Sequence, residues 1–151
     1  MELSFREATE SDIPTLVTLL ADDPLGKQRE DASMPLNARY LEAFQHIDND
    51  PNNELIVVEQ EDTIIGMLQL TFIPYLTHTG STRCLIEGVR IAKAHRGSGL
   101  GRLCFEWAIS RAKERQCNIV QLTSNKQRTE ALKFYKNLGF EATHEGFKLV
   151  V

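Results

Sequence analysis

Cysteine is scarce in this sequence, and its few residues lie at no spacing that would let them act together. The three thiols, Cys84, Cys104 and Cys117, form no CxxC pair and no Cys/His ligand pattern. An odd number of cysteines without such spacing argues against a disulfide framework and against a structural zinc site. We therefore expect reduced thiols in a cytoplasmic protein, and no metal ion.

Long apolar runs and dense basic blocks are missing as well. No stretch approaches the roughly 18 apolar residues of a membrane span, and the start "MELSFREATESD" has neither the basic nor the apolar region of a secretory signal. The net charge is −4, and the basic residues form no block that would neutralise a phosphate backbone. We expect neither a membrane nor a nucleic acid as partner.

The rest of the composition is that of an ordinary globular protein. Hydrophobic residues make up 42% of the 151 residues, so a chain of this length can bury a core without disulfides. No internal repeat or low-complexity tract interrupts it. We expect one domain over residues 1–151.

Apolar periodicity predicts a mixed α/β fold of the α+β type, with flanking helices. Strands are expected at 4–7, 54–60, 63–73, 83–91 and 119–124. Helices are expected at 9–22, at 37–48, from Leu100 onward and at 129–138, whereas the polar stretch 22–35 has no clear pattern. A tight turn at Glu61 and Asp62 predicts an antiparallel hairpin, and a second hairpin is expected at 140–151. The helix that starts at Leu100 should bury Leu100, Leu103, Cys104, Trp107 and Ala108. The sheet should begin antiparallel and acquire a strand-helix-strand crossover in its second half.

The stretch "HRGSGLG", residues 95–101, stands between the predicted strand 83–91 and the helix after it. A helix N-terminus offers unpaired N–H groups and the positive end of a dipole, and glycine lets a phosphate approach them. A tight turn that needs positive φ would explain the same glycines. A dinucleotide fingerprint would need glycine where Arg102 stands, and a P-loop would need a Gly-Lys-Ser/Thr string that is missing. The spacing thus supports neither NAD nor ATP.

The remaining string, Arg96-x-x-Gly99-x-Gly101, resembles the acyl-coenzyme A loop of the GNAT N-acetyltransferase family. The segment "IEGVRIAKAHRGSGLGRLCFEWA" resembles the central strand, loop and helix of that family. The later segment "NKQRTEALKFYKNLGF" resembles its distal element, and "FREATESDIPTL" is typical of its N-termini. Together these segments span nearly the whole chain.

The resemblance implies binding of acetyl-CoA as acetyl donor, with coenzyme A as product. The pyrophosphate would lie on the loop N–H groups, and the pantetheine arm would pair with the edge of strand 83–91 where that strand splays from the next. The residues implied are Val89, Arg90, Ile91, Arg96, Gly97, Ser98, Gly99, Leu100, Gly101, Arg102 and Asn125.

Acetyl transfer to an amine needs a base and an acid. Glu87 has the strand parity of Leu85, Val89 and Ile91, and burial among such neighbours would make it a stronger base. A structural carboxylate paired with Arg83 or Arg90 is the alternative.

Tyr135 coincides with the tyrosine that, in the family, protonates the coenzyme A thiolate; otherwise it is an amphipathic core anchor. Cys84 alternates with Glu87 and has no histidine partner, which favours a core thiol over a nucleophile. His78 could border the acceptor, but a lone loop histidine is more often solvated.

These features predict an acetyl-CoA-dependent N-acetyltransferase that acts on a primary amine of a small molecule by direct attack in a ternary complex. Acetylation of a protein or peptide, at its N-terminus or at a lysine, is one alternative. A non-catalytic acyl-CoA-binding or interaction module is another, although such a module would not need Glu87 and Tyr135. Homodimers are common among proteins that resemble this one.

Overall fold

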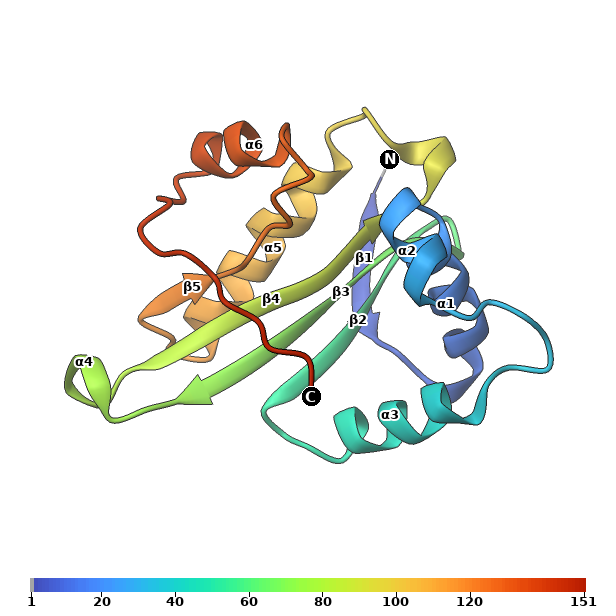
Figure 1. Ribbon diagram of the computed structural model, residues 1–151, viewed down its shortest axis with the longest axis horizontal. Helices are drawn as coiled ribbons and strands as arrows, with labels where there is room; N and C mark the ends of the chain where they lie inside the picture. The colour runs from blue at the N-terminus through green and yellow to red at the C-terminus, as the bar shows by residue number, and fades with distance from the viewer. Residues whose placement is uncertain (1) are drawn as a thin grey trace. The chain divides into compact units, whose positions relative to one another are not determined.

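The computed structural model describes residues 2–151 and divides the chain into two compact units, Met1–Gln121 and Leu122–Val151. The first unit is built on a five-stranded mixed sheet (Figure 1). Its strands are β1 (Leu3–Glu7), β2 (Asn53–Gln60), β3 (Thr63–Pro74), β4 (Thr82–Ile91) and β5 (Ile119–Gln121). They follow one another in chain order; β1 to β4 are antiparallel, and β5 is parallel to β4. The predicted mixed fold and crossover are confirmed.

Helices of the first unit lie between these strands in the chain. They are η1 (Glu10–Asp12), α1 (Ile13–Ala21), α2 (Pro24–Arg29), α3 (Ala38–Asp48), α4 (Thr77–Gly80), η2 (Lys93–His95) and α5 (Leu100–Glu114). The second unit contains α6 (Ala131–Asn137), after which Gly139 adopts a φ of 99°. A glycine in this conformation is a common end for a helix.

Local signals explain the hairpin of β2 and β3. Glu61 and Asp62 both adopt left-handed backbone conformations, with φ of 50° and 62°. Two successive positive φ values give a turn whose twist matches that of the paired strands, so the chain reverses within two residues. Pro74 ends β3, because proline has no N–H to donate to a further ladder bond.

The two faces of the sheet bury different helices. Val57 of β2 and Met67 of β3 pack with residues of α1 and α3 in one apolar cluster. On the opposite face, the buried Glu54 of β2 pairs with Arg111 of α5, and the ring of Phe5 stacks on Trp107 at 4.7 Å. Each fully buried Leu, Ile or Val side chain contributes about 1.5–3 kcal/mol. The alternation along β2 therefore fixes α1 and α3 on one side of the sheet and α5 on the other.

A network of ion pairs connects the start of α1 to strands β1 and β2. Arg6 donates to both oxygens of Asp12, at 2.7 and 3.0 Å, and to Glu59 of β2. Asp12 also accepts from the N–H of Thr9, which forms a capping box at the start of η1. The hydrogen bond from Arg6 lowers the pKa of Asp12 to about 2, although burial opposes this shift.

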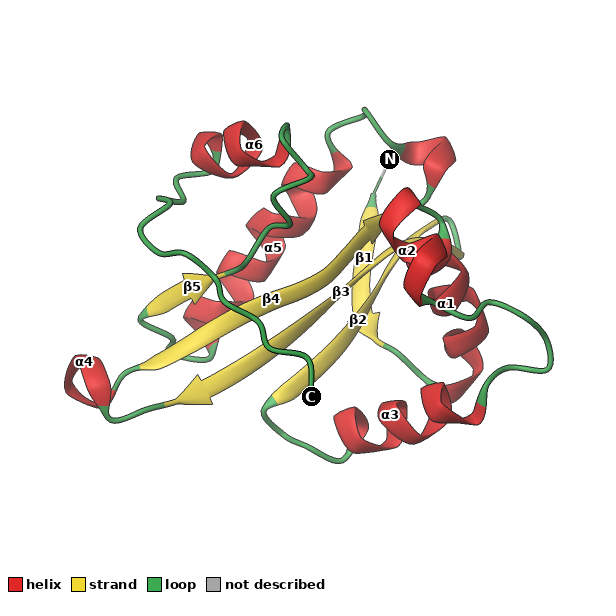
Figure 2. Cartoon of the chain, in the orientation of Figure 1, coloured by secondary structure: helices red, strands yellow, loops and turns green. Residues whose placement is uncertain are grey.

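Two expectations drawn from the sequence are wrong in detail, and one helix was not predicted. The polar stretch 22–35 contains α2, because Asp23 caps it by accepting from the N–H of Gly26 and Pro24 occupies its first turn. Leu103 of α5 is 46% exposed, and the buried row instead includes Phe105 and Ala112. Residues 140–151 form no hairpin and are drawn as loop in Figure 2. A hairpin without an apolar surface to pack on is marginal, and Phe147 is 89% exposed.

Candidate active site

A glycine-rich loop carries the chain from β4 to α5. Gly97 and Gly99 adopt φ of 79° and 82°, and Gly99 is the N-cap of α5. A side chain is strained in this conformation, so the backbone alone explains these two glycines. A Cβ at either position would meet no atom within 4 Å, so the space above the loop is also open. Both interpretations of the glycines are therefore compatible with the geometry.

The N–H groups at the start of α5 are available to a ligand. Leu103 N donates to Gly99 O at 3.3 Å, and no backbone acceptor is found among residues 2–151 for the N–H groups of Leu100, Gly101 and Arg102. No side chain caps this helix either. Free N–H groups together with the dipole of a 15-residue helix form a site for an anion such as a pyrophosphate.

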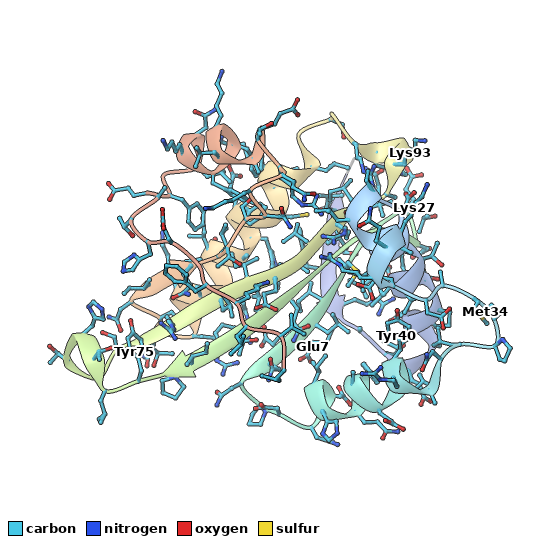
Figure 3. The ribbon with its side chains drawn as sticks, viewed as in Figure 1. Glu7, Lys27, Met34, Tyr40, Tyr75 and Lys93 are labelled. Carbon is cyan, nitrogen blue, oxygen red and sulfur yellow. The ribbon has the colours of Figure 1, made fainter. Side chains whose placement is uncertain are left out.

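Side chains of the loop brace it. Arg96 donates to Ile91 O at 2.9 Å and to Asp22 O at 3.0 Å, which ties the loop to the end of α1. Ser98 Oγ donates to His95 O at 2.7 Å, and Arg102 pairs with Glu106 one turn along the helix. Arg96 and Ser98 thus bond to backbone oxygens in and around the loop, whereas Arg102 makes an exposed pair along α5. Exposed Lys93 of η2 and Lys27 of α2 are visible in Figure 3, and sequence reasoning had assigned them no role.

Strand β4 contains a β-bulge at Gly88. Gln69 pairs with Glu87 and Met67 pairs with Arg90, so Leu68 stands opposite both Gly88 and Val89. Gly88 has a φ of 62°, which suits the first residue of such a bulge. The extra residue puts Arg90 on the face of Glu87 and moves Ile91 to the other. The expected common parity of Glu87 with Ile91 is thus wrong, and the glycine inside the strand was the available signal.

The edge of β4 toward β5 is mostly open. Pairing with β5 is limited to Arg83–Leu85 against Ile119–Gln121, so in the described part of the chain residues 86–91 have no strand partner on that side. An extended ligand could pair with this edge, in the way a peptide adds a strand. Val89 O accepts a hydrogen bond from Arg90 Nη1 at 2.9 Å, which such a ligand would have to accommodate.

Arg90 forms a nearly buried ion pair in this region. Its guanidinium forms an ion pair with Asp23 at 3.4 Å, and both side chains are nearly buried, with 12% and 10% exposed. It therefore connects β4 to the junction of α1 and α2. The coenzyme contact that the resemblance implies for Arg90 stays a prediction.

Glu87 is exposed at the same face of β4. Within residues 2–151 its carboxylate makes no hydrogen bond or ion pair. The two arginines considered as structural partners are engaged elsewhere, since Arg90 pairs with Asp23 and Arg83 lies over the ring of Tyr75 at 4.8 Å. The expected burial of Glu87 is not found. What the structure provides is an accessible carboxylate on the strand that carries the open edge.

The second unit holds the other two predicted site residues. Tyr135 of α6 is half-buried and makes edge-to-face contacts with Phe134 and Phe140, at 5.4 and 6.1 Å between ring centroids. Asn125 Oδ1 accepts from the N–H of Gln127 at 2.9 Å, which fixes a turn before α6. The oxygen of this amide is thus engaged in the turn.

Two buried cysteines and His78 lie in surroundings that do not favour a catalytic role. Burial raises the pKa of Cys84 to about 12 and that of Cys104 to about 11, which makes both poor nucleophiles at neutral pH. His78 sits in the left-handed turn α4, edge-on to Tyr75. No group of three or more metal-ligating side chains gathers within residues 2–151, and none of the helices there is long and apolar enough to cross a membrane.

Comparisons with known proteins agree with this geometry. A protein from Bacillus halodurans C-125, described as a transcriptional regulator, is 53% identical, with a TM-score of 0.96 over 99% of this chain and 100% of its own. A Trypanosoma brucei acetyltransferase is 25% identical, with a TM-score of 0.79 over 99% and 100%. Arabidopsis thaliana glucosamine-6-phosphate N-acetyltransferase, 19% identical, shares the fold with a TM-score of 0.80 over 99% of both chains. Comparison with curated proteins gives no match.

The sequence also matches the model of a whole protein family. The model of the acetyltransferase (GNAT) family matches residues 16–140, which include the bulged strand, the glycine loop and α6. Members of this family are acyltransferase enzymes that use acetyl-CoA as co-substrate. The chain therefore belongs to the GNAT acetyltransferase family.

Proposed function

We propose that the protein transfers an acetyl group from acetyl-CoA to a primary amine of a small molecule, by direct attack in a ternary complex. The observation that carries the proposal is the combination on β4: an open strand edge, free N–H groups at the loop that follows, and an exposed carboxylate on the same strand. We further propose that residues 1–151 act as one catalytic domain.

The loop would hold the diphosphate of acetyl-CoA, which supplies a thioester as the activated acetyl donor. N–H groups of residues 97–102 would donate to the phosphates, and Gly97 and Gly99 leave the approach clear because neither has a Cβ. The backbone of Val89–Ile91 would pair with the amides of the pantetheine arm. Arg96 would keep the loop in shape by its bonds to Ile91 and Asp22 rather than by contact with phosphate.

Glu87 would serve as the base, directly or through water. An amine arrives at neutral pH as an ammonium ion, which must lose a proton before its nitrogen can attack. An exposed carboxylate without a competing cation can take that proton and pass it to solvent. Tyr135 would donate a proton to the thiolate that leaves coenzyme A, a role that needs its hydroxyl and not only its ring.

Other features support an amine acceptor over a nucleic acid. The net charge of −4 and the lack of a basic block argue against binding to a phosphate backbone, although the Bacillus relative is described as a transcriptional regulator. An acidic protein suits a cationic acceptor. The three free cysteines are compatible with action in the cytoplasm, where thiols stay reduced. A homodimer is the assembly we expect.

The proposal is tested by measuring release of the coenzyme A thiol with a panel of amines, together with product mass. Spermidine, glucosamine 6-phosphate, kanamycin and free amino acids represent small molecules; short peptides with a free N-terminus or a lysine represent the protein alternative. Acetylation of a small amine well above the rate of thioester hydrolysis supports the proposal. Exclusive acetylation of peptides favours the alternative, and no acetylation of any amine contradicts an N-acetyltransferase.

A further inference from the structure

A row of polar side chains crosses the face of the sheet that carries Glu87. Asn53 of β2 and Gln69 of β3 lie diagonally across their strand pair, and Gln69 is the register partner of Glu87. Asp50, just after α3, begins the row. We refer to Asp50, Asn53, Gln69 and Glu87 as the polar row. Side chains of register partners have Cβ atoms about 4.5–5.5 Å apart, so Gln69 and Glu87 can bind one small group together.

Hydrogen bonding fixes which way the amides of the polar row point. The carboxylate of Asp50 can only accept, so the NH2 group of Asn53 faces it, at 2.8 Å. The carbonyl oxygen of Asn53 therefore points the other way, where it accepts from the hydroxyl of Thr71 at 2.8 Å. Gln69 turns its own NH2 group toward this oxygen in a weak bond of 3.5 Å. The orientation of both amides thus follows from the carboxylate at the start of the row.

This orientation leaves acceptors, and no donor, at the end of the row. The oxygen of Gln69 faces away from Asn53 and has no hydrogen-bond donor within residues 2–151; the same holds for the carboxylate of Glu87. Two arginines of β4 lie on this face, and neither pairs with Glu87: Arg90 is held by Asp23, and Arg83 lies over the ring of Tyr75. A neutral oxygen and a carboxylate side by side match a group with several N–H donors and a positive charge.

We propose that Gln69 binds the acceptor amine, with Asn53 and Asp50 as positioning residues. The inference rests on the proposed function and adds to it: the acceptor enters as a primary ammonium ion, and two of its N–H groups are bound by Gln69 and Glu87. Once Glu87 has taken one proton, the remaining N–H group toward Gln69 keeps the nitrogen in place for attack. An alcohol of the same shape has one O–H donor and loses one of the two bonds.

Three variants separate binding from structure. Gln69→Met keeps the length of the side chain and removes its oxygen, whereas Gln69→Glu keeps an acceptor and adds a charge. Thr71→Val is the matched control, because it removes a stronger bond to the same Asn53 oxygen on the same strand and face. The acceptor is the best amine of the panel above, with its hydroxyl analogue for comparison, and acetyl-CoA affinity is measured separately by thermal shift.

We expect Gln69→Met to raise KM for the amine about 10- to 100-fold, the range for a hydrogen bond to a charged group, with acetyl-CoA affinity unchanged. Gln69→Glu should bind the cationic amine at least as well as the wild type, and Thr71→Val should lower the melting temperature and leave KM within about twofold. Unchanged KM in Gln69→Met overturns the inference and leaves the proposed function standing. Should that variant not fold, a raised KM in Gln69→Glu overturns it as well. A wild type that acetylates no amine overturns the proposed function, and the inference with it.

Discussion

A negative charge at Gly99 should prevent acetyl-CoA from binding without unfolding the protein. Gly99 has a φ of 82°, so any side chain there costs about 1–2 kcal/mol of backbone strain. No further clash arises, because a Cβ at this position would meet nothing within 4 Å. In Gly99→Glu, a carboxylate about 5 Å from a phosphate, at an effective dielectric constant of about 20, adds a repulsion of roughly 3 kcal/mol per charge pair. The dissociation constant should therefore rise at least about 100-fold.

Two further variants separate charge from strain. Gly99→Gln has nearly the same shape without the charge, so it should weaken binding much less than Gly99→Glu. Gly80→Glu, in the turn α4, has a similar φ of 69° and equally open surroundings, so it carries the same strain away from the loop. All four proteins should unfold cooperatively without ligand.

Thermal unfolding with and without acetyl-CoA reads out the effect. Ligand at about 100 times its dissociation constant adds about 2.7 kcal/mol, and for a protein of this size each kcal/mol moves the melting temperature by about 2–4 °C. We expect a shift of roughly 5–10 °C for the wild type and for Gly80→Glu, and none for Gly99→Glu. A normal shift in Gly99→Glu would show that the phosphates do not lie on this loop.

Three further predictions concern the catalytic side chains and the anchor of α1. Glu87→Gln should lower kcat about 100-fold near neutral pH and recover partly at high pH, where the amine loses its proton unaided; an unchanged pH profile of kcat would exclude Glu87 as the base. Tyr135→Phe should lower turnover about 10- to 1000-fold with unchanged acetyl-CoA affinity, since it removes a bond made only as the thiolate leaves; normal turnover would leave water as the acid. The carboxyl of Asp12 has a pKa of about 2 in the folded protein, compared with 3.8 for an unperturbed aspartate. Its ionised form therefore stabilises the folded state by roughly 2 kcal/mol above about pH 4, and this contribution is lost as the pH falls toward 2. In Asp12→Asn, the free energy of unfolding measured by chemical denaturation should be lower by this amount at neutral pH and should fall less between pH 4 and pH 2. An unchanged fall over this pH range would argue against the pairing with Arg6.

Local signals determined how much of the fold the sequence could predict. The turn at Glu61 and Asp62 depends on two adjacent residues, and it was predicted correctly. The helix α2 was missed because Asp23 and Pro24, a good cap and first residue for a helix, are equally good turn residues. The hairpin expected at 140–151 failed because strand propensity alone does not provide an apolar surface on which to pack.

For the candidate site too, features within one short stretch of sequence could be predicted, and features that join distant residues could not. The loop from Arg96 to Arg102 is contiguous, so its spacing could be recognised, but the hydrogen bond from Arg96 to Asp22 joins residues far apart in the chain and could not be predicted. The expectation that Glu87 and Ile91 share a face of β4 was wrong, because the extra residue at Gly88 moves every later side chain of the strand to the opposite face. The link from Asn53 to Gln69 crosses two strands diagonally and depends on register, which no single stretch of sequence contains.

Direct transfer of an acetyl group from acetyl-CoA to an amine is the central claim, and intact-mass analysis with a stoichiometry assay tests it most directly. The enzyme is incubated with isotopically labelled acetyl-CoA, first alone and then with the best amine of the panel. We expect no acetyl group on the protein in the first mixture, because Cys84 and Cys104 are buried thiols with raised pKa values. In the second we expect one labelled acetylated amine for each coenzyme A released. A stable acetyl-enzyme that passes its label to the amine would contradict direct attack, and coenzyme A release without labelled amine would contradict acetyl transfer altogether.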